Sequence, residues 1–424
     1  MAFPRPKLTI GILILGVLVW FPNPLQAQSQ TTSAIRGRVV SPDGEGIGDA
    51  SVSVKHLLTG AERSVLSDSA GGFIVLLLQP GGPYTVSATR IGFSTDAESG
   101  IRLQVGERYE VVLTLESRPV ALEGISVSVE KNKIFDPSQI GPATLLNEST
   151  IRSVPLPSRD IMDLAILSPL VRTTKSGGFS IAGQNDRYNS ILVDGLGNKD
   201  AFGLTSGGVP GGQAGAKLLP LDAVAQYEIL VAPYDVGLSG FAGGVMNAVT
   251  KVGTNEWRFN TFAVGRHAAL MGDLTLPQGP AEASGIQRAT VGGSVGGPIV
   301  QDKAHFFIAG EWERNTQPPS GYILGRDPPE LVGILPEVVE AFQTVFEYDH
   351  EVDTGEAGLF DLDQSLGNIF ARLDWHLGKG KRITLRNVFA YARNDESPNR
   401  APFDPYEFSS NGITRTSASN TASI

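Results

Sequence analysis

The sequence predicts a mainly β protein: an N-terminal β-sandwich, an α+β domain, and the first strands of an incomplete transmembrane antiparallel β-barrel. Three observations lead to this fold class. Short runs of alternating apolar and polar residues recur along the chain, with glycine- and proline-rich turns between them. Only 18% of the 424 residues are charged and 50 are glycine, which favours sheets with many turns over helical bundles. After residue 253, the strands place apolar residues on one face and polar residues on the other.

The composition argues against several kinds of partner and chemistry. The net charge of −10 disfavours a nucleic-acid partner, because phosphate binding requires clustered lysine and arginine. The chain has no cysteine, which excludes disulfides, a thiol nucleophile and cysteine-ligated metals. Its five histidines form no HExxH pair, and no nucleophile and base can be paired. We therefore expect no enzyme activity, no cofactor and no metal site.

Residues 1–27 have the pattern of a secretory signal peptide. Arg5 and Lys7 precede an apolar stretch over 8–21, and the small residue Ala27 follows two prolines. The alternative is an uncleaved membrane anchor, but the stretch is shorter than the ~20 residues of a spanning helix. We expect export and cleavage after Ala27.

Residues 34–116 contain about seven short alternating runs separated by glycine- and proline-rich turns, which predicts a β-sandwich. The segments GRVVSPDGEGIGDASVSV and SDSAGGFIVLLLQPGGPYTVSATRIGF resemble the carboxypeptidase regulatory-like domain, an accessory fold related to carbohydrate-binding sandwiches. Despite that name, nothing in these residues supports a peptidase.

Residues 117–136 form a linker that contains LEGISVSVEKN, an extended alternation that ends in charge. One interpretation is a spacer or a last strand of the sandwich. The other is a free strand that adds to the edge of a partner's sheet, where backbone hydrogen bonds supply affinity.

Residues 137–252 mix helix and strand signals and are rich in glycine loops. Helical spacing over 159–164 follows Ser158 as a candidate cap. The segment NSILVDGLG predicts a strand followed by a tight turn at Asp194-Gly195. We expect an α+β domain with a mixed or antiparallel sheet. Its predicted strands are 191–193, 227–231 and 244–250.

Three motifs in order carry a family resemblance: ILVDGLG, LPLDAVAQYEILVAPYDVGLSGFAGGVMNAVTKVGTNEW and VGGSVGGPIVQDKAHFFIAGEWER. Together they resemble the plug and first barrel strands of TonB-dependent outer-membrane receptors, in particular the Oar-like branch. The resemblance covers about residues 34–392. It implies that 137–252 is a plug domain and that 253–424 is the start of an Oar-like outer-membrane β-barrel, here truncated.

The resemblance also implies two sets of site residues. The linker strand resembles a TonB box, whose contacts to TonB would be Leu122, Glu123, Ile125, Val127 and Val129. The plug motif consists of Asp194, Gly195, Gly240, Gly243, Gly244 and Asn247. Its glycines would let the plug sheet pack closely on its own loops and on the barrel wall.

The barrel prediction also rests on the strands themselves. Within 368–376 the odd-numbered residues are apolar and most even-numbered residues are polar or charged, and 382–391 repeats this alternation after a short LGKGK turn. A soluble sandwich also alternates, but it rarely places Arg and Asp together on one face. Only 172 residues follow residue 252. A 22-stranded barrel needs about 220 before loops, so we expect a fragment or a truncated product.

The segment 327–363 carries eleven acidic residues and no lysine or arginine. We interpret it as a solvated acidic loop, because the spacing around Asp349 departs from a calcium-binding EF-hand at its sixth and twelfth positions. We expect it to face the cell exterior, since the LGKGK turn is short, as periplasmic turns are.

Two functions are consistent with these patterns. The resemblance implies a TonB-dependent receptor of the outer membrane that imports an external substrate through a plugged barrel. Its partners would be TonB with its inner-membrane energising complex, outer-membrane lipid, and a siderophore, oligosaccharide or peptide as substrate. The alternative is a carbohydrate-binding or adhesive surface protein anchored in the outer membrane. Sugar binding needs exposed aromatic rings, and residues 34–116 offer only Phe73, Tyr84, Phe93 and Tyr109.

Overall fold

The protein is described by a computed structural model. The described residues are 32–117, 143–174, 178–200, 208–231, 233, 241–270, 274–276, 279–281, 287–317, 335–351, 354, 360–378, 381–396 and 413–423. The predicted signal peptide and all five predicted TonB-contact residues lie outside them.

Residues 33–114 form a sandwich of two sheets, as predicted. The three-stranded sheet has the order β4-β1-β7 and the four-stranded sheet the order β3-β2-β5-β6. Alternate residues of both sheets, such as Ile35, Val52 and Leu113, are fully or almost fully buried between them. The seven strands are β1 (Ser33–Val40), β2 (Ser51–His56), β3 (Glu62–Leu66), β4 (Gly72–Leu78), β5 (Gly81–Thr89), β6 (Asp96–Leu103) and β7 (Arg108–Thr114).

The next domain, described between residues 143 and 250, is built on a five-stranded mixed sheet of order β12-β11-β14-β13-β8. We call it the mixed-sheet domain. β11 and β14 are parallel, and the other neighbours are antiparallel. The strands predicted at 191–193, 227–231 and 244–250 are all present. The sheet strands are β8 (Ala143–Asn147), β11 (Ser190–Val193), β12 (Leu196–Gly197), β13 (Val224–Val231) and β14 (Gly244–Thr250); β9 (Val171–Thr173) and β10 (Phe179–Ile181) pair separately.

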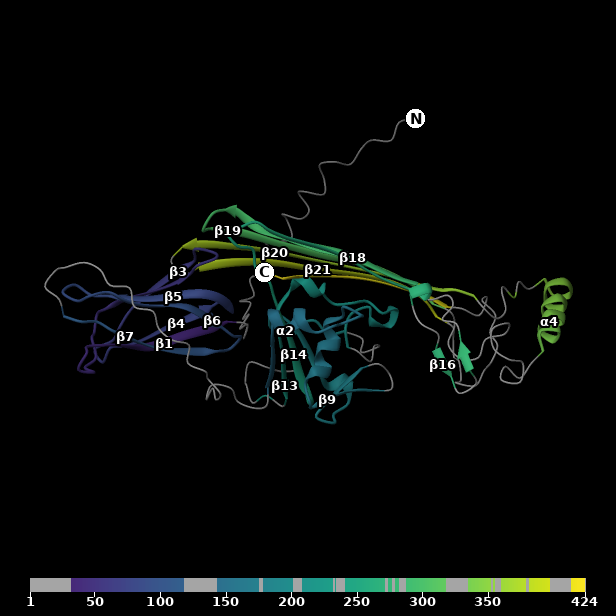
Figure 1. The fold of residues 1–424 in the computed structure, drawn as a ribbon, viewed down its shortest axis with the longest axis horizontal. Coiled ribbons are helices and arrows are strands. Elements are labelled where there is room, and N and C mark those ends of the chain that lie inside the picture. Colours follow the sequence, from purple (N-terminus) through teal and green to yellow (C-terminus); the bar gives the residue numbers. More distant parts are fainter. Residues whose placement is uncertain are drawn as a thin grey trace, which may run out of the picture.

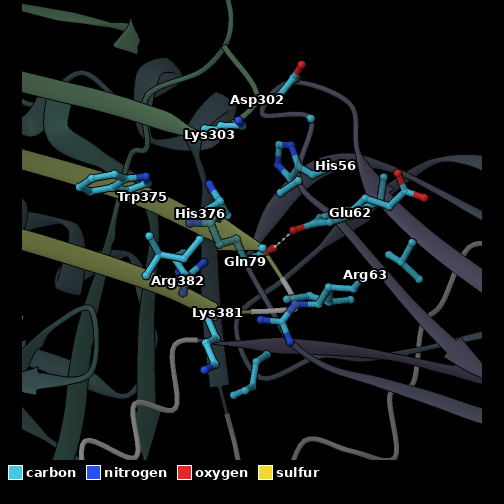
Figure 2. A pocket seen from close by; sticks show the side chains of 18 residues that line it. His56, Glu62, Arg63, Gln79, Asp302, Lys303, Trp375, His376, Lys381 and Arg382 are labelled. Atoms are coloured by element: carbon cyan, nitrogen blue, oxygen red, sulfur yellow. Dashed lines mark hydrogen bonds between the residues drawn. The ribbon is translucent and has the colours of Figure 1, made fainter. Parts of the chain in front are cut away.

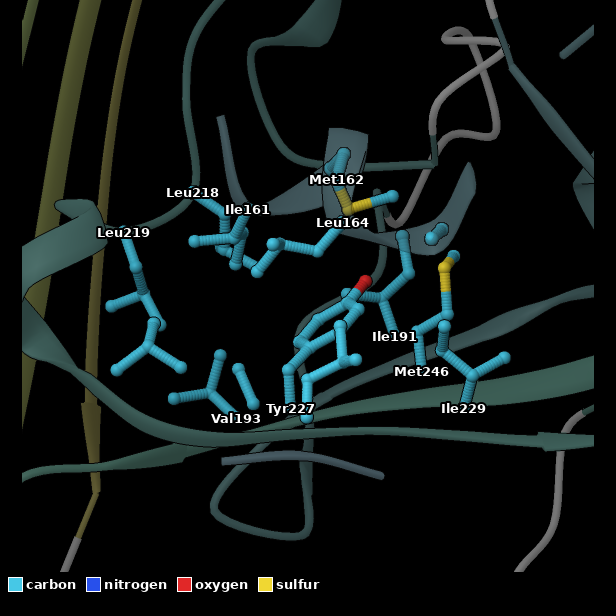
Figure 3. Packing of buried hydrophobic residues seen from close by; sticks show 14 of the residues in the cluster. Ile161, Met162, Leu164, Ile191, Val193, Leu218, Leu219, Tyr227, Ile229 and Met246 are labelled. Carbon is cyan, nitrogen blue, oxygen red and sulfur yellow. The ribbon is translucent and has the colours of Figure 1, made fainter. Parts of the chain in front are cut away.

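Short helices cover one face of this sheet and contribute to its core, in which Tyr227, Ile229 and Met246 are buried (Figure 3). The helix predicted after Ser158 begins later than expected. Arg159 has a left-handed φ of 51°, so the helix starts only after Asp160, whose side chain accepts a hydrogen bond from Met162 N at 2.9 Å. The helices are α2 (Glu148–Ser153), η1 (Ile161–Leu167), η2 (Asp186–Tyr188), η3 (Gly212–Ala214) and η4 (Leu221–Ala223).

The third part is an antiparallel six-stranded sheet, β15-β18-β19-β20-β21-β22, whose strands follow one another in sequence. Its long strands bear out the predicted alternation: Ile369 and Trp375 are each 51% exposed on one face, whereas Arg372 and Asp374 are buried on the other. The strands are β15 (Arg258–His267), β18 (Gln287–Val300), β19 (Ala304–Gln317), β20 (Leu362–Gly378), β21 (Lys381–Glu396) and β22 (Ile413–Ser423). Between β15 and β18 lie η5 (Ala268–Leu270), β16 (Leu274–Leu276) and β17 (Gly279–Ala281).

The acidic segment 327–363 is not simply a loop. It contains the 14-residue helix α4 (Pro336–Asp349). Apolar Val338, Phe342 and Val345 recur at helical spacing between the acidic residues, and Pro336 stands at the first helical turn. The segment was interpreted as a loop because of its many acidic residues, and the helical spacing of its apolar residues was not considered.

The six-stranded sheet lies along the mixed-sheet domain, with the sandwich beneath one end of its strands and α4 beyond the other (Figure 1). Phe307, Phe370 and Val388 on the buried face of this sheet belong to the same apolar cluster as the core of the mixed-sheet domain. The two parts therefore share one core. No helix in the described part of the chain is both long and apolar enough to cross a membrane.

Candidate functional site

The predicted turn at Asp194-Gly195 joins β11 to β12 and has the tight geometry expected. Asp194 has φ 49° and Gly195 φ 77°, so both central residues are left-handed, as in the two-residue turns that suit hairpins. Gly195 N donates to Asn247 Oδ1 at 3.2 Å, which ties the turn to the neighbouring strand β14. The predicted Asp194-Gly195 turn is thus hydrogen-bonded to Asn247, a third residue of the predicted plug motif.

Asp194 is 2% exposed, and its carboxylate joins the mixed-sheet domain to the six-stranded sheet. It accepts hydrogen bonds from Thr250 N at 2.8 Å and Thr250 Oγ1 at 2.6 Å. It also forms ion pairs with Arg372 Nη1 at 3.4 Å and Arg386 Nε at 3.3 Å, from β20 and β21. We call these residues and Asp374 the Asp194 cluster.

Arg372 is held in place by residues of the six-stranded sheet and of the mixed-sheet domain. Its Nε and Nη2 donate to the two carboxylate oxygens of Asp374 at 2.7 and 3.1 Å, and its Nη1 donates to Thr250 Oγ1 at 2.8 Å. Arg372 and Arg386 are cross-strand partners, so their like charges lie side by side on the buried face. Asp194 and Asp374 supply two compensating negative charges, and removing either leaves an excess of buried positive charge.

A second ionic cluster joins the same two parts elsewhere. Arg159 from the mixed-sheet domain pairs with Glu311 of β19 at 2.8 Å and with Asp222 at 3.1 Å. Lys217 pairs with Glu313 of β19 at 2.7 Å. The Glu311 and Glu313 side chains are 4% and 5% exposed, so both carboxylates are almost completely shielded from solvent. We call this group the Glu311–Glu313 cluster.

The cations of this cluster are further oriented by their surroundings. Arg288 of β18 pairs with Glu313 at 2.9 Å and donates to Ser158 O at 3.0 Å, while Lys217 Nζ also donates to Ser158 O. The Arg159 guanidinium lies 3.6 Å from the centre of the Phe262 ring, a cation–π contact across the boundary. Its left-handed backbone at φ 51° is a strained conformation held by these partners.

Asn247, another predicted site residue, lies opposite Glu228 on the neighbouring strand β13. Asn247 Nδ2 donates to Glu228 Oε2 at 3.5 Å. Burial raises the pKa of Glu228 to about 7, and the hydrogen bond from Asn247 only partly opposes this. Glu228 is therefore a buried carboxyl group that gains or loses its proton near neutral pH.

The glycines of the predicted motif serve the mixed-sheet domain itself. A Cβ on Gly244 would lie 2.6 Å from Ile181 Cγ2 and 2.7 Å from Leu230 O, and one on Gly243 would lie 2.5 Å from Asn189 Oδ1. Both close approaches are to the domain's own strands and loops, and the expected approach of these two glycines to the wall is not observed. Gly240 lies outside the described residues.

The Glu311–Glu313 cluster was not predicted from the sequence. The alternation of β19 marked both glutamates as lying on the polar face, but nothing in the sequence paired them with Arg159 or Lys217. Within the described residues, no group of three or more His, Asp or Glu could hold a metal ion. The arrangement instead holds two packed parts together through buried ion pairs, which can separate without any covalent step.

Residues 34–116 match the carboxypeptidase regulatory-like domain family. Over 262 residues the chain is 27% identical to the TonB-dependent transporter Oar of Myxococcus xanthus, covering 58% of this chain and 23% of that protein. Over 223 residues it is 26% identical to the probable TonB-dependent siderophore receptor PirA of Acinetobacter baumannii, covering 49% of this chain and 27% of that protein.

The chain spans about a quarter of the length of these curated relatives. Among solved structures, the siderophore receptor PirA from Acinetobacter baumannii aligns with a TM-score of 0.39 and 18% identity, covering 60% of this chain and 32% of that one. By sequence, this chain is related to the TonB-dependent transporters and carries a carboxypeptidase regulatory-like domain at residues 34–116.

Proposed function

We propose that this chain belongs to a TonB-dependent receptor of the outer membrane, which binds an external substrate and imports it with energy delivered by TonB. In this proposal the mixed-sheet domain is the plug and the six-stranded sheet is the start of the surrounding barrel wall. The exposed apolar face, with Ile369 and Trp375, would face lipid. A siderophore, oligosaccharide or peptide remains the proposed class of substrate.

The observation that carries this proposal is the pair of buried ionic clusters between the two parts. In the absence of TonB, a plug must remain bound to the barrel wall, and it must move relative to that wall when TonB pulls on the linker. Ion pairs are suited to this, because a displaced Asp194 or Glu311 can exchange its protein partners for water once the boundary opens. A purely apolar contact would not respond to charge or hydration in this way.

The energy contact is proposed to be the linker strand, with Leu122, Glu123, Ile125, Val127 and Val129 as its residues. TonB would pair with this strand through its backbone, in the manner of strand addition. Because the linker precedes the plug in the chain, a pull on it would reach the mixed-sheet domain directly.

The alternative of a carbohydrate-binding or adhesive protein is less well supported. A sugar-binding face needs exposed aromatic rings. In the sandwich, Phe73 and Tyr84 are 7% and 3% exposed, and Phe93 and Tyr109 are half-buried against the core. These four rings therefore serve packing.

The test is binding of the purified periplasmic domain of TonB to the full chain in detergent. We expect saturable binding that Val127→Pro abolishes, because proline lacks the N–H that strand addition uses. Val127→Ala is the matched control and should weaken binding only slightly. Absence of binding to the unaltered chain, or equal binding by both variants, would refute the proposed energy contact.

A further inference from the structure

A cavity of about 570 Å³ lies between the sandwich and one end of the six-stranded sheet (Figure 2). The sandwich contributes the end of β2, the start of β3 and the segment that links β4 to β5. The six-stranded sheet contributes the β18–β19 turn and the β20–β21 turn. The volume is in the range of cavities that bind small organic molecules.

The two walls of this cavity are fixed to each other by Asn255. Its backbone N donates to Leu58 O of the sandwich at 2.8 Å, and its Nδ2 donates to Asp302 Oδ1 at 2.7 Å. The β2–β3 turn packs so closely here that a Cβ on Gly60 would lie 1.8 Å from Asp302 Oδ1. The cavity is therefore bounded by a hydrogen-bonded domain contact.

Four cationic side chains from both walls line the cavity: Arg63, Lys303, Lys381 and Arg382. Only two carboxylates line it, and both have other partners: Asp302 accepts from Asn255, and Glu62 accepts from the Ser53 hydroxyl. Among the described residues, no carboxylate forms an ion pair with Lys303, Lys381 or Arg382, although the buried carboxylate of Asp374 acts electrostatically on Arg382. Four cations against two carboxylates leave the lining with an excess of positive charge.

A buried amide also lines this space. Gln79 is 7% exposed, and its Nε2 has no hydrogen-bond partner among the described residues. Its own backbone carbonyl is occupied by Tyr84 OH at 2.8 Å, as drawn in Figure 2. A buried donor left without an acceptor is costly, so its presence beside the cations indicates a place for an acceptor.

The remaining lining includes the imidazoles of His56 and His376 and a group of apolar side chains, among them Val54, Leu77 and Leu78. A free oxyanion would fill a small part of the volume and would leave these side chains untouched. A ligand that combines a charged oxyanion with an organic body would use both kinds of wall.

We propose that this cavity binds an organic phosphate, with the phosphate held by Lys303, Arg382 and Gln79 Nε2 and the organic part against Leu77 and Leu78. A phosphate group carries up to two charges and several acceptor oxygens, so it can accept from two cations and an amide at once, which a single carboxylate does less well. The phosphate could belong to a soluble ester or to a phospholipid headgroup. Binding of a phospholipid headgroup rests on the proposed membrane location, whereas binding of a soluble ester does not. Neither form of binding depends on TonB or on the imported substrate.

The experiment titrates the full chain, in a phosphate-free maltoside detergent, with glycerol 3-phosphate and with dihexanoyl phosphatidylglycerol, by calorimetry. Glycerol and succinate are the matched neutral and dicarboxylate probes. We expect saturable binding of at least one phosphate probe, little binding of glycerol, and weaker binding of succinate. Binding of the lipid alone would assign a headgroup, and binding of both would assign a site that also accepts soluble esters.

Arg382→Gln and Lys303→Gln should each raise the dissociation constant about tenfold or more, the loss expected for a charge-assisted hydrogen bond. Lys55→Gln is the control: it lies on β2 beside the cavity residue His56 but is exposed on the opposite face, and it should change binding less than about twofold. Should Arg382→Gln lower the unfolding temperature, the exposed Lys303→Gln gives the same test. No saturable phosphate binding, tighter binding of succinate, or equal effects of Lys55 and Lys303 substitutions would overturn the proposal.

Discussion

Asp194 and Arg372 form an ion pair of 3.4 Å across 178 residues of sequence, with side chains only 3% and 5% exposed. The pair joins the tight β11–β12 turn to the middle of β20. A buried pair of this kind contributes little net stability relative to an apolar contact of the same shape. Removing one partner is costly, because the other charge is left in a dry environment.

Asp194→Asn should therefore weaken the contact between the mixed-sheet domain and the six-stranded sheet. The substitution leaves Arg372 and Arg386 side by side with only Asp374 to compensate them. We expect a loss of about 3–5 kcal/mol in the free energy of unfolding, measured by chemical denaturation. Asp43→Asn in an exposed sandwich turn is the control and should change stability by less than about 0.5 kcal/mol. Equal losses in the two variants would show that the Asp194 contacts do not stabilise this boundary.

The turn itself gives a second prediction. Gly195 has φ 77°, a conformation that β-branched residues rarely adopt, so Gly195→Val should cost about 1 kcal/mol or more. Gly197, two residues later, is the matched control. Its backbone is not left-handed, and a Cβ there would meet nothing within 4 Å, so Gly197→Ala should be nearly neutral. The comparison is made by thermal unfolding, and a neutral Gly195→Val would contradict the turn geometry.

The third prediction concerns Glu228 and pH. Because burial raises the pKa of Glu228 from 4.5 to about 7, the folded state holds its proton more tightly than the unfolded state does. The contribution of this group is fully present below pH 4.5 and is lost as pH rises through about 7. Glu228→Gln removes that loss. Relative to the unaltered chain, the variant should gain up to about 3 kcal/mol in unfolding free energy between pH 4.5 and pH 8.

Unfolding free energies of both proteins measured at several pH values check this prediction. Glu45→Gln, at an exposed turn of the sandwich, is the control and should leave the pH dependence unchanged. A parallel pH dependence for Glu228→Gln and the unaltered chain would mean that Glu228 titrates in the folded protein as it does in the unfolded chain.

Local patterns in the sequence were sufficient to predict β11, β13, β14 and the alternation of β20, but β8, β9 and β10 were not predicted. The alternation of β20 placed Arg372 and Asp374 on one face, and the Asp-Gly pair located the β11–β12 turn, because both features depend on neighbouring residues. The partner of Asp194 could not be predicted in this way. It depends on how β11, β14 and β20 meet in space, and no short-range pattern encodes a contact over 178 residues.

The start of helix η1 and the presence of α4 were missed for different reasons. The left-handed backbone of Arg159 is held by Glu311, Asp222 and Phe262, which are all distant in sequence, so its effect on the helix start is tertiary. Helix α4 has a local signal, since its apolar residues recur at helical spacing, but the high density of acidic residues favoured a loop interpretation.

The last prediction concerns the orientation of the chain in the proposed membrane. Helix α4 and the sandwich lie at opposite ends of the six-stranded sheet (Figure 1). If the sandwich is periplasmic, as a domain preceding the plug would be, the acidic segment containing α4 must lie outside the cell. The short β20–β21 turn lies at the sandwich end, consistent with the short periplasmic turns of such barrels.

The chain has no native cysteine, so single cysteines can be labelled without background. In intact cells, a membrane-impermeant maleimide should label Asp349→Cys at the end of α4 and should leave Lys381→Cys at the β20–β21 turn unlabelled. Lys381 is preferable to its cross-strand partner Gly378, whose φ of 77° would strain a substituted residue. After the outer membrane is permeabilised, both sites should react, because both are exposed. Labelling of Lys381→Cys alone in intact cells would invert the proposed orientation, and labelling of both would place neither end behind a membrane.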